Sequence, residues 1–374
     1  MIDPLQLLKE LVSIPGVSGE EREAAEYLVR RMADLGFRSF VDEAGSAVGI
    51  LEQPDSDGAI TFEGVLLGHI DTVPGKIPVE VRDGCLYGRG TVDAKGPLAA
   101  FVLAAAQADL APGTRLIVVG AVEEEAATSK GAWHLVENLP GSGKESGSRV
   151  PDFCVIGEPS GSDAVTLGYK GRMLFEYSFS QEMSHTAGPG QTAPEKAVRW
   201  WQSICDYTDH FNNGRERIFD QLSPSLRQID SSTNGIRDFV SAKVGMRIPP
   251  GVDLEVLEKE IRQLAESADL EVYGQVPAYR SPRNTPLVRA FSSVLRKQGI
   301  RPRLKIKTGT SDMNVAGPRW GCPIVAYGPG DSSLDHTPNE HIQIDEYYQA
   351  ISTLVQVLNR VQEVQDEFMP VFDH

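Results

Sequence analysis

Apolar residues repeat along the first half of the chain with two different spacings. Between residues 4 and 14 they stand three or four apart, which predicts an amphipathic helix with Pro4 in its first turn. The runs RLIVVGAV (residues 115–122) and DFCVIG (residues 152–157) are almost continuously apolar, as in strands that are buried on both faces. These strand patterns alternate with helical ones, including an alanine-rich helix just after Asp93. The pattern therefore predicts an α/β fold with helices on both sides of its sheet.

A second helix is predicted to start after residue 18. Ser18 and Glu21 have the spacing of a capping box, and Gly36 suits the C-terminal end of the helix.

The pattern changes near residue 168. Residues 173–180 alternate between apolar and polar, as in an antiparallel strand, and a helix follows. A polar stretch up to about residue 237 is typical of a loop, and strand and helix patterns then resume in an order close to the β-α-β-β-α-β of a ferredoxin-like unit. We therefore predict a domain of residues 168–283, inserted into a discontinuous domain of residues 1–167 and 284–374.

Composition narrows the possible functions. The chain has 374 residues and a net charge of −16, which argues against a nucleic-acid-binding surface. We expect no membrane span because no apolar run reaches 18 residues, and no signal peptide is apparent in residues 1–30. The four cysteines lie far apart, which favours reduced thiols in a cytoplasmic protein.

Histidines and acids follow the ends of several predicted strands. Alone, a histidine is usually an ordinary residue, and an acidic triplet is usually a solvated helix start. In open α/β sheets, however, functional groups collect beyond the carboxyl ends of the strands. The residues at these ends are His69, Asp71, Asp93, Glu123–Glu125 and Glu158, and His336 follows a later strand.

The mixture of side chains predicts a metal centre. Imidazole and carboxylate ligands without thiolate suit Zn²⁺ or a similar divalent ion. There is one carboxylate more than a single ion needs, which indicates two ions that share a bridging ligand. Asp71, two residues after His69, could orient the imidazole through its far nitrogen, or it could be a turn residue before Pro74.

Competing motifs fail at particular positions. The segment GRGTVD has Asp93 where a dinucleotide-binding loop needs its third glycine, and PGSGKES has Asn138 where a P-loop needs its first. The chain also has no G-x-S-x-G nucleophile motif.

Five motifs together resemble one known family. They are GHIDTVPG, GRGTVDAKG, VEEEAATSKG, GEPS and DHTPNEH. In this order and at these separations they are similar to the dinuclear zinc peptidases and deacylases, which include acetylornithine deacetylase, succinyl-diaminopimelate desuccinylase, aminoacylase and carboxypeptidase G. The resemblance runs through nearly the whole chain. It implies a zinc-exopeptidase-like catalytic domain with a mixed or parallel sheet, and an inserted ferredoxin-like α+β domain that acts as a lid and a dimerisation surface.

The resemblance also implies a role for each candidate residue of the metal centre. His69 and Glu158 would hold one zinc ion, Glu125 and His336 would hold the other, and Asp93 would bridge both. Glu124 would be the catalytic base, although the run of three glutamates leaves a shift by one residue open. Two divalent ions are expected, with Zn²⁺ first and Co²⁺ or Mn²⁺ as alternatives.

Further residues are implied in and around the inserted domain. His185, in SHTAGP, would stabilise the oxyanion. Asn234 and Arg247 would contact the substrate, and Gly309 and Thr310, in TGTSD, would line the site of its carboxylate. Arg247 could also be an ordinary strand residue at the surface.

The motifs look most like the branch of the family that releases lysine or ornithine. The expected reaction is hydrolysis of a linear amide in a small N-acyl amino acid or in a conjugate with a glutamyl carrier protein, by a cytoplasmic homodimer. Two alternatives stay open. The first is another hydrolase of the family, such as an acetylornithine deacetylase, a succinyl-diaminopimelate desuccinylase or a di- or tripeptidase. The second is a catalytically silent metal-binding protein used in assembly or regulation.

Overall fold

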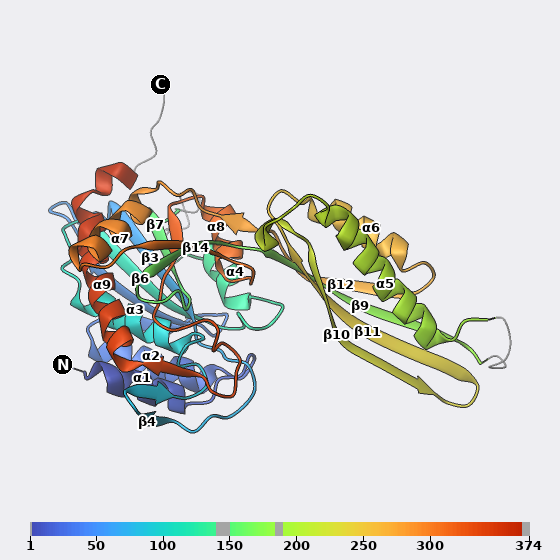
Figure 1. The fold of residues 1–374 in the computed structure, drawn as a ribbon. Coiled ribbons are helices and arrows are strands. Elements are labelled where there is room, and N and C mark those ends of the chain that lie inside the picture. The colour runs from blue at the N-terminus through green and yellow to red at the C-terminus, as the bar shows by residue number, and fades with distance from the viewer. Residues whose placement is uncertain (1, 140–149, 184–189, 369–374) are drawn as a thin grey trace. The chain divides into compact units, whose positions relative to one another are not determined.

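The computed structural model describes residues 2–139, 150–183 and 190–368, which form two compact units (Figure 1). Unit 1 consists of Met1–Gly168, Ser281–Ile306 and Ser311–His374, and unit 2 of Tyr169–Arg280 and Lys307–Thr310. The insert that we predict at residues 168–283 has residues 169–280 in common with unit 2. Its role as a lid or dimerisation domain stays a prediction.

Unit 1 is built on a mixed sheet, which confirms the predicted α/β class. Its strand order is β1-β2-β6-β3-β7-β15-β8, with β14 paired to β8. The four central strands β6, β3, β7 and β15 are parallel to one another, whereas β1, β2 and β8 join antiparallel. The strands are β1 Arg38–Val41, β2 Ala47–Gln53, β3 Phe62–His69, β6 Thr114–Ala121, β7 Phe153–Gly157, β8 Ala164–Tyr169, β14 Arg303–Lys307 and β15 Ile324–Ala326.

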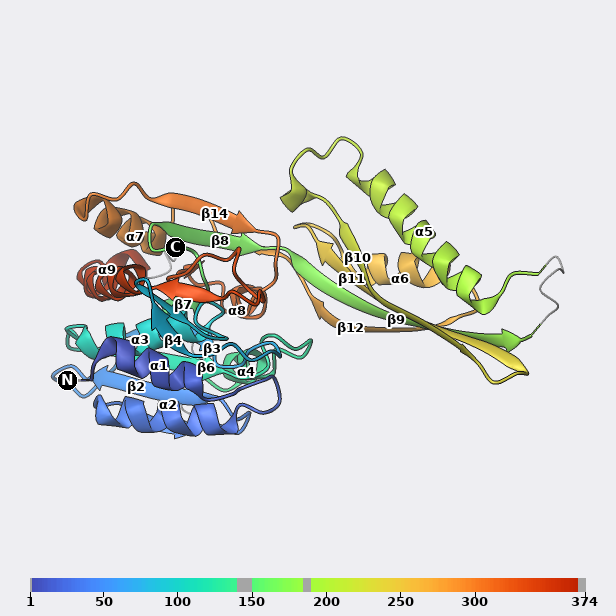
Figure 2. The same cartoon turned by 60° about the horizontal axis from the view of Figure 1, so that its bottom comes forward.

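Helix α3 (Lys95–Gln107) is buried along most of its length, from Lys95 to Ala105. Its small alanine side chains allow close packing on β3, β6 and β7, while α1 and α9 contact it as well (Figures 1 and 2). Gly68 of β3 lies directly against Leu98, so that a larger residue at this position would separate the helix from the strand. The other helices of unit 1 are α1 Pro4–Ser13, α2 Arg22–Asp34, α4 Lys130–Glu137, α7 Pro286–Lys297, α8 Met313–Trp320 and α9 Ile344–Glu363.

The predicted capping box at the start of α2 is wrong. Helix α2 begins at Arg22 with Glu21 as its N-cap, and no side chain caps it. The Ser18 hydroxyl instead donates a hydrogen bond to Asp71 at 2.7 Å, across 53 positions of the sequence. The Ser18 hydroxyl therefore binds a distant residue, Asp71, and does not cap the helix.

A small three-stranded sheet lies beside these elements in unit 1. Its order is β16-β5-β4, with antiparallel pairing throughout. The strands are β4 Glu80–Arg82, β5 Cys85–Tyr87 and β16 His341–Gln343. The sheet joins the segment just before Asp93 to the segment just after His336.

Unit 2 has the predicted β-α-β-β-α-β order, and its antiparallel sheet has the strand order β10-β11-β9-β12 of a ferredoxin-like fold (Figure 1). Helices α5 and α6 pack on one face of the sheet, where the rings of Tyr177 and Trp200 stack at 4.7 Å. The elements are β9 Gly171–Glu182, α5 Ala193–Asn212, β10 Ser223–Thr233, β11 Arg237–Ile248, α6 Leu254–Leu264 and β12 Asp269–Val276.

The loop predicted up to about residue 237 is wrong, because β10 occupies much of that stretch. From Ser225 onward, every residue of β10 is exposed. A strand without a buried face has no reason to alternate apolar and polar residues, so the period-two signal is missing.

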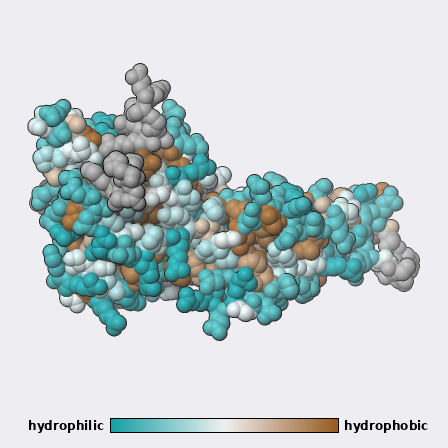
Figure 3. Space-filling view, turned by 90° about the horizontal axis from the view of Figure 1, so that it is seen from above, coloured by the Kyte–Doolittle hydropathy of each residue, from teal (hydrophilic) through white to brown (hydrophobic). Residues whose placement is uncertain are grey.

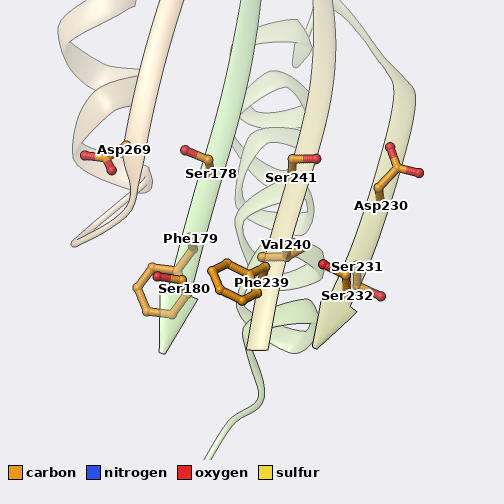
Figure 4. A pocket seen from close by; sticks show the side chains of 10 residues that line it. All are labelled: Ser178, Phe179, Ser180, Asp230, Ser231, Ser232, Phe239, Val240, Ser241 and Asp269. Carbon is orange, nitrogen blue, oxygen red and sulfur yellow. The ribbon is translucent and has the colours of Figure 1, made fainter. Parts of the chain in front are cut away.

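The surface of unit 2 has two further features. Figure 4 shows a hollow on the sheet face opposite the helices, with Ser178, Ser180, Phe239 and Ser241 in its lining. None of the predicted site residues that the structure describes lines it. In the space-filling view, apolar side chains also gather in a patch on this unit (Figure 3).

Across the described residues, no helix combines the length and the hydropathy of a membrane span.

We expect Gly64→Ala to destabilise unit 1, because a Cβ at this position of β3 would overlap the ring of Phe153 in the neighbouring β7. The free energy of unfolding, measured in urea, should fall by about 1–3 kcal/mol. Phe153→Leu in the same chain should relieve the overlap, so the double variant should lose less stability than the sum of the single variants. Strict additivity would show that the ring and the added methyl group do not meet.

Candidate metal centre

The parallel strands bring three predicted site segments to one edge of the sheet. His69 is the last residue of β3 and pairs with Ala121, the last residue of β6. The acidic triplet Glu123–Glu125 follows β6 directly, and Glu158 follows β7. Since β3, β6 and β7 run in the same direction, these side chains leave the sheet at the same end.

The Asp93 carboxylate lies between two imidazoles and offers one oxygen to each. His69 Nε2 is 3.3 Å from Asp93 Oδ1, and His336 Nε2 is 3.0 Å from Asp93 Oδ2. His336 Nε2 also lies 2.8 Å from Glu125 Oε1. The two histidines are 267 positions apart in the sequence and meet on opposite oxygens of one carboxylate.

This donor set fits divalent ions. His69, Asp93 and Glu125 each present a ligand atom within 4.8 Å of the others. Two atoms that bind one Zn²⁺ at about 2.0–2.1 Å with tetrahedral angles are about 3.3 Å apart, close to the separations found here. No thiolate takes part, so the set suits Zn²⁺ and the harder divalent ions. The residues present therefore fit the metal that the sequence motifs imply.

The electrostatics show how much negative charge is gathered at the site. Burial raises the pKa of Glu124 well above its ordinary value, and the charges of Glu158, Asp312 and Glu125 raise it further against the opposing effect of His69. Burial also raises the pKa of Glu125, although its hydrogen bond with His336 works in the other direction. A carboxyl cluster of this kind stabilises any positive charge that enters it.

The same negative charge favours the protonated, positively charged form of the two histidines. Hydrogen bonds with Asp93 and Glu125 raise the pKa of His336 to about 10. Burial by itself would lower the pKa of His69, but Asp71 and Asp93 overcome this effect and raise the pKa well above its ordinary value. A histidine must lose its extra proton before it can bind a metal ion. A bound cation therefore replaces the positive charge of the imidazolium, and the metal ion and the protons compete for the site.

Asp71 is fully buried and organises the acidic triplet as well as His69. Its Oδ1 accepts the backbone N–H of Glu124 at 3.1 Å, and its Oδ2 accepts that of Glu125 at 3.0 Å together with the Ser18 hydroxyl. Its Oδ1 also lies 3.3 Å from His69 Nδ1. One carboxylate thus fixes the orientation of an imidazole and the backbone of two neighbouring acids. The alternative of a simple turn residue does not describe these contacts.

The first glutamate of the triplet faces other partners. Glu123 accepts a hydrogen bond from the Thr128 hydroxyl at 2.6 Å and lies 3.7 Å from the Lys130 ammonium. Its backbone N–H donates to Glu21. The triplet is also not a helix start, because α4 begins only at Lys130. These contacts leave Glu124 and Glu125 to face the histidines, which is the register favoured by the motif.

The remaining predicted residues belong to unit 2 or lie outside the described residues. His185 is outside them. The Asn234 side-chain oxygen accepts N–H groups of Ile236 and Arg237 in the turn between β10 and β11. Arg247 donates to the Thr310 hydroxyl, which in turn donates to the Lys170 carbonyl. A Cβ at Gly309 would meet nothing within 4 Å, so there is open space beside this half-buried residue.

Sequence reasoning missed several residues that support this centre. Ser18 and Glu21 hold Asp71 and the triplet from the N-terminal segment, and nothing in their local sequence indicates it. Lys95 is 1% exposed and donates from Nζ to the Ile14 carbonyl at 2.7 Å and to the Leu11 carbonyl at 3.3 Å. It thereby ties the end of α1 to the start of α3, two residues after Asp93.

A family model describes most of the chain. The model of peptidase family M20/M25/M40 matches residues 65–360. Among curated relatives, the [LysW]-lysine hydrolase of Deinococcus radiodurans is 41% identical, over 95% of this chain and 96% of its own length. The putative [LysW]-lysine/[LysW]-ornithine hydrolase of Thermococcus kodakarensis is 39% identical, over 96% of this chain and 92% of its own.

Solved structures share the fold at low sequence identity. An M20 family metallo-carboxypeptidase from Sulfolobus solfataricus aligns with a TM-score of 0.76 and 19% identity, over 96% of this chain and 99% of its own. The dinuclear metal-binding peptidase YXEP of the M20 family from Bacillus subtilis aligns with a TM-score of 0.64 and 12% identity, over 96% and 98%.

The buried Lys95 makes the stability of unit 1 depend on pH in a defined way. Burial lowers its pKa from 10.5 to about 8, against the opposing charges of Asp71 and Glu340. Between these two values the unfolded chain holds a proton that the folded chain has released, so the contribution of Lys95 to stability rises with pH. Below pH 8 both states are protonated and the burial cost is present in full.

We therefore expect wild-type protein to gain stability relative to Lys95→Met when the pH rises from 7.5 to 9.5. Urea unfolding of both proteins at the two pH values measures the difference, and the comparison cancels the titration of other groups. A constant difference would show that the Lys95 pKa is the same in the folded and unfolded chains.

Proposed function

Because the chain belongs to peptidase family M20/M25/M40, and is thus a hydrolase as its motifs predicted, we propose that it hydrolyses an amide bond with the help of two divalent metal ions. One observation carries the proposal. The Asp93 carboxylate offers one oxygen to each of two histidines, as a carboxylate shared by two ions does.

We assign the ligands as the motifs imply. His69 and Glu158 would hold one ion, Glu125 and His336 would hold the other, and Asp93 would bridge them. The contacts of Asp93 with both histidines, and of His336 with Glu125, support this grouping. Zn²⁺ is the proposed ion because imidazole and carboxylate ligands suit it, and Co²⁺ or Mn²⁺ could take its place.

The proposed mechanism uses Glu124 to move protons. When bound, two such ions would lower the pKa of a water molecule and polarise the carbonyl of the amide. Glu124 would take a proton from the water as its oxygen bonds to the carbonyl carbon, and would give the proton to the amine nitrogen as the C–N bond breaks. Burial and neighbouring acids raise its pKa, which suits a group that must both accept and release a proton. His185 would stabilise the oxyanion.

The proposed substrate is a [LysW]-linked lysine or ornithine, from which the chain would release the free amino acid. Support comes from two relatives with 39–41% identity along almost the whole chain, whose names give this reaction. Arg247 and Thr310 lie in hydrogen-bonding contact in unit 2, and we assign them, with Gly309 and Asn234, to the binding of substrate. A guanidinium group can bind a substrate carboxylate through two hydrogen bonds.

A homodimer and a cytoplasmic location complete the proposal. The four cysteines are all free, which agrees with a reducing compartment. The alternative of a catalytically silent protein loses its support, since the residues that we propose as base and ligands are all present and the relatives are named as hydrolases.

We expect Glu124→Ala to lower kcat by at least about 10²-fold, because it removes the proton acceptor. The variant should still contain the metal of the wild type, as measured by mass spectrometry of the purified protein. Glu125→Ala is the matched control and should lose metal, since it removes a proposed ligand. If Glu124→Ala itself lost metal, and Glu123→Ala kept metal but lost turnover, the register of the triplet would be shifted by one residue.

A substrate panel tests the assignment of the leaving group. We expect kcat/KM for [LysW]-linked lysine or ornithine to exceed that for acetyl-lysine, acetyl-ornithine and succinyl-diaminopimelate by tenfold or more, on the order of the discrimination that one or two additional contacts provide. A preference for acetyl-ornithine or succinyl-diaminopimelate would assign the chain to another reaction of the family. Bound metal without turnover of any substrate would support the silent alternative.

A further inference from the structure

Glu340 is a completely buried carboxylate to which neither the sequence motifs nor the proposed mechanism gives a role. It lies directly before β16 and is 0% exposed. Its Oε1 accepts three backbone N–H groups, from Gly90 at 2.9 Å, Val92 at 3.0 Å and Asp93 at 3.1 Å. Its Oε2 accepts a hydrogen bond from Arg89 at 2.6 Å. A single side chain therefore holds most of the segment that ends at Asp93.

This segment also has hydrogen bonds of its own, from Thr91 to the Gly88 carbonyl and from the Gly96 N–H to the Gly90 carbonyl. Residues 88–94 form turns between β5 and α3 and belong to no strand or helix. Gly90 has a φ of +88°, a conformation that other residues rarely adopt. Backbone N–H groups that no ladder satisfies need another acceptor when they are buried, and the Glu340 carboxylate is the acceptor for three of them.

Glu340 is itself anchored close to the second histidine. The next residue, His341, pairs with Tyr87 in the ladder between β16 and β5. The backbone carbonyl of Glu340 also accepts the N–H of Gly88. His336 lies four positions before Glu340 in the same connection. The side chain thus links the loop of Asp93 to the segment that carries His336, although about 250 positions separate them in the sequence.

We infer that Glu340 is a positioning residue of the metal centre, which sets the backbone of Asp93 so that its two carboxylate oxygens reach both histidines. The inference rests on the proposed metal centre. Hydrogen bonds to an ionised acceptor are stronger than those between neutral groups, so a carboxylate suits the task better than an amide. Arg89 supplies the positive charge that makes its burial tolerable.

Glu340→Gln tests the inference with little change of volume. The amide keeps one oxygen but places an NH₂ group where the second oxygen met Arg89 or the loop. Metal-free protein is titrated with Co²⁺, and the visible absorption bands of the ion report both its affinity and the geometry of its ligands. Loss of a residue that orients metal ligands typically weakens metal binding 10–100-fold, which is the expected effect for at least one of the two ions.

Glu63→Gln is the matched control. Glu63 is also a buried carboxylate, 1% exposed, and accepts a hydrogen bond from Arg115 at 2.9 Å. It lies near the start of β3, at the opposite end of the strand from His69. Both variants should lower the Tm, but Glu63→Gln should bind Co²⁺ with wild-type affinity and spectrum. An effect on stability alone therefore cannot imitate the expected result.

The outcomes are distinct. Weaker Co²⁺ binding or an altered spectrum in Glu340→Gln alone supports the inference, whereas wild-type binding in both variants overturns it and leaves the metal centre intact. If wild-type protein binds no Co²⁺, the proposed centre fails, and the role of Glu340 fails with it. Should Glu340→Gln not fold, Arg89→Met keeps the carboxylate and removes its cation. Arg89→Met should also weaken Co²⁺ binding, and Co²⁺ binding by this variant with wild-type affinity would overturn the inference.

Discussion

Repulsion between buried carboxylates is the constraint around which the centre of unit 1 is arranged. Glu124 and Glu125 follow β6, Glu158 follows β7 and Asp93 lies in the turn before α3, and all four are largely withdrawn from water. Two like charges 4 Å apart cost about 4 kcal/mol even at an effective dielectric constant of about 20. A fold that brings such groups together needs positive charge in the same place. Here two imidazoles occupy it, and divalent cations can supply more.

The constraint explains why so much of the surrounding chain serves to hold loops in place. Asp71 accepts the N–H groups of Glu124 and Glu125, and Glu340 accepts those of the segment that ends at Asp93. In both cases a buried carboxylate fixes a backbone that belongs to no sheet or helix. Side chains that repel each other would move apart on flexible loops, and so the backbone must be held before a ligand set can be shared. Lys95 adds a positive charge close to both carboxylates, since Asp71 and Glu340 each act on its pKa.

The sequence predicted what depends on local pattern and strand direction. The runs of β6 and β7 are apolar because both faces are buried, and parallel strands place the following acids at one edge. Contacts between distant segments carry no such signal: Ser18 has the spacing of a cap but binds Asp71, and Glu340 meets Asp93 across 247 positions. Strand β10 was missed for the opposite reason, because an element exposed on both faces leaves no period in its sequence. The triplet consists of three identical residues, so that only the contacts in the structure distinguish Glu123 from its neighbours.

The geometry of the metal centre also limits how far it can select between substrates. Its proposed ligands and the groups that hold them all belong to unit 1. Proteins named as a carboxypeptidase, an aminopeptidase and a dipeptidase share this fold at 14–19% identity, so the fold itself does not select a substrate. The proposed metal pair and proton-transferring acid would act on the amide bond, which every such substrate contains. Discrimination between substrates must therefore come from side chains outside the ligand set. In this chain we propose Arg247, with its partner Thr310, for this role, because a guanidinium group distinguishes a free carboxylate from an amide by charge and by shape.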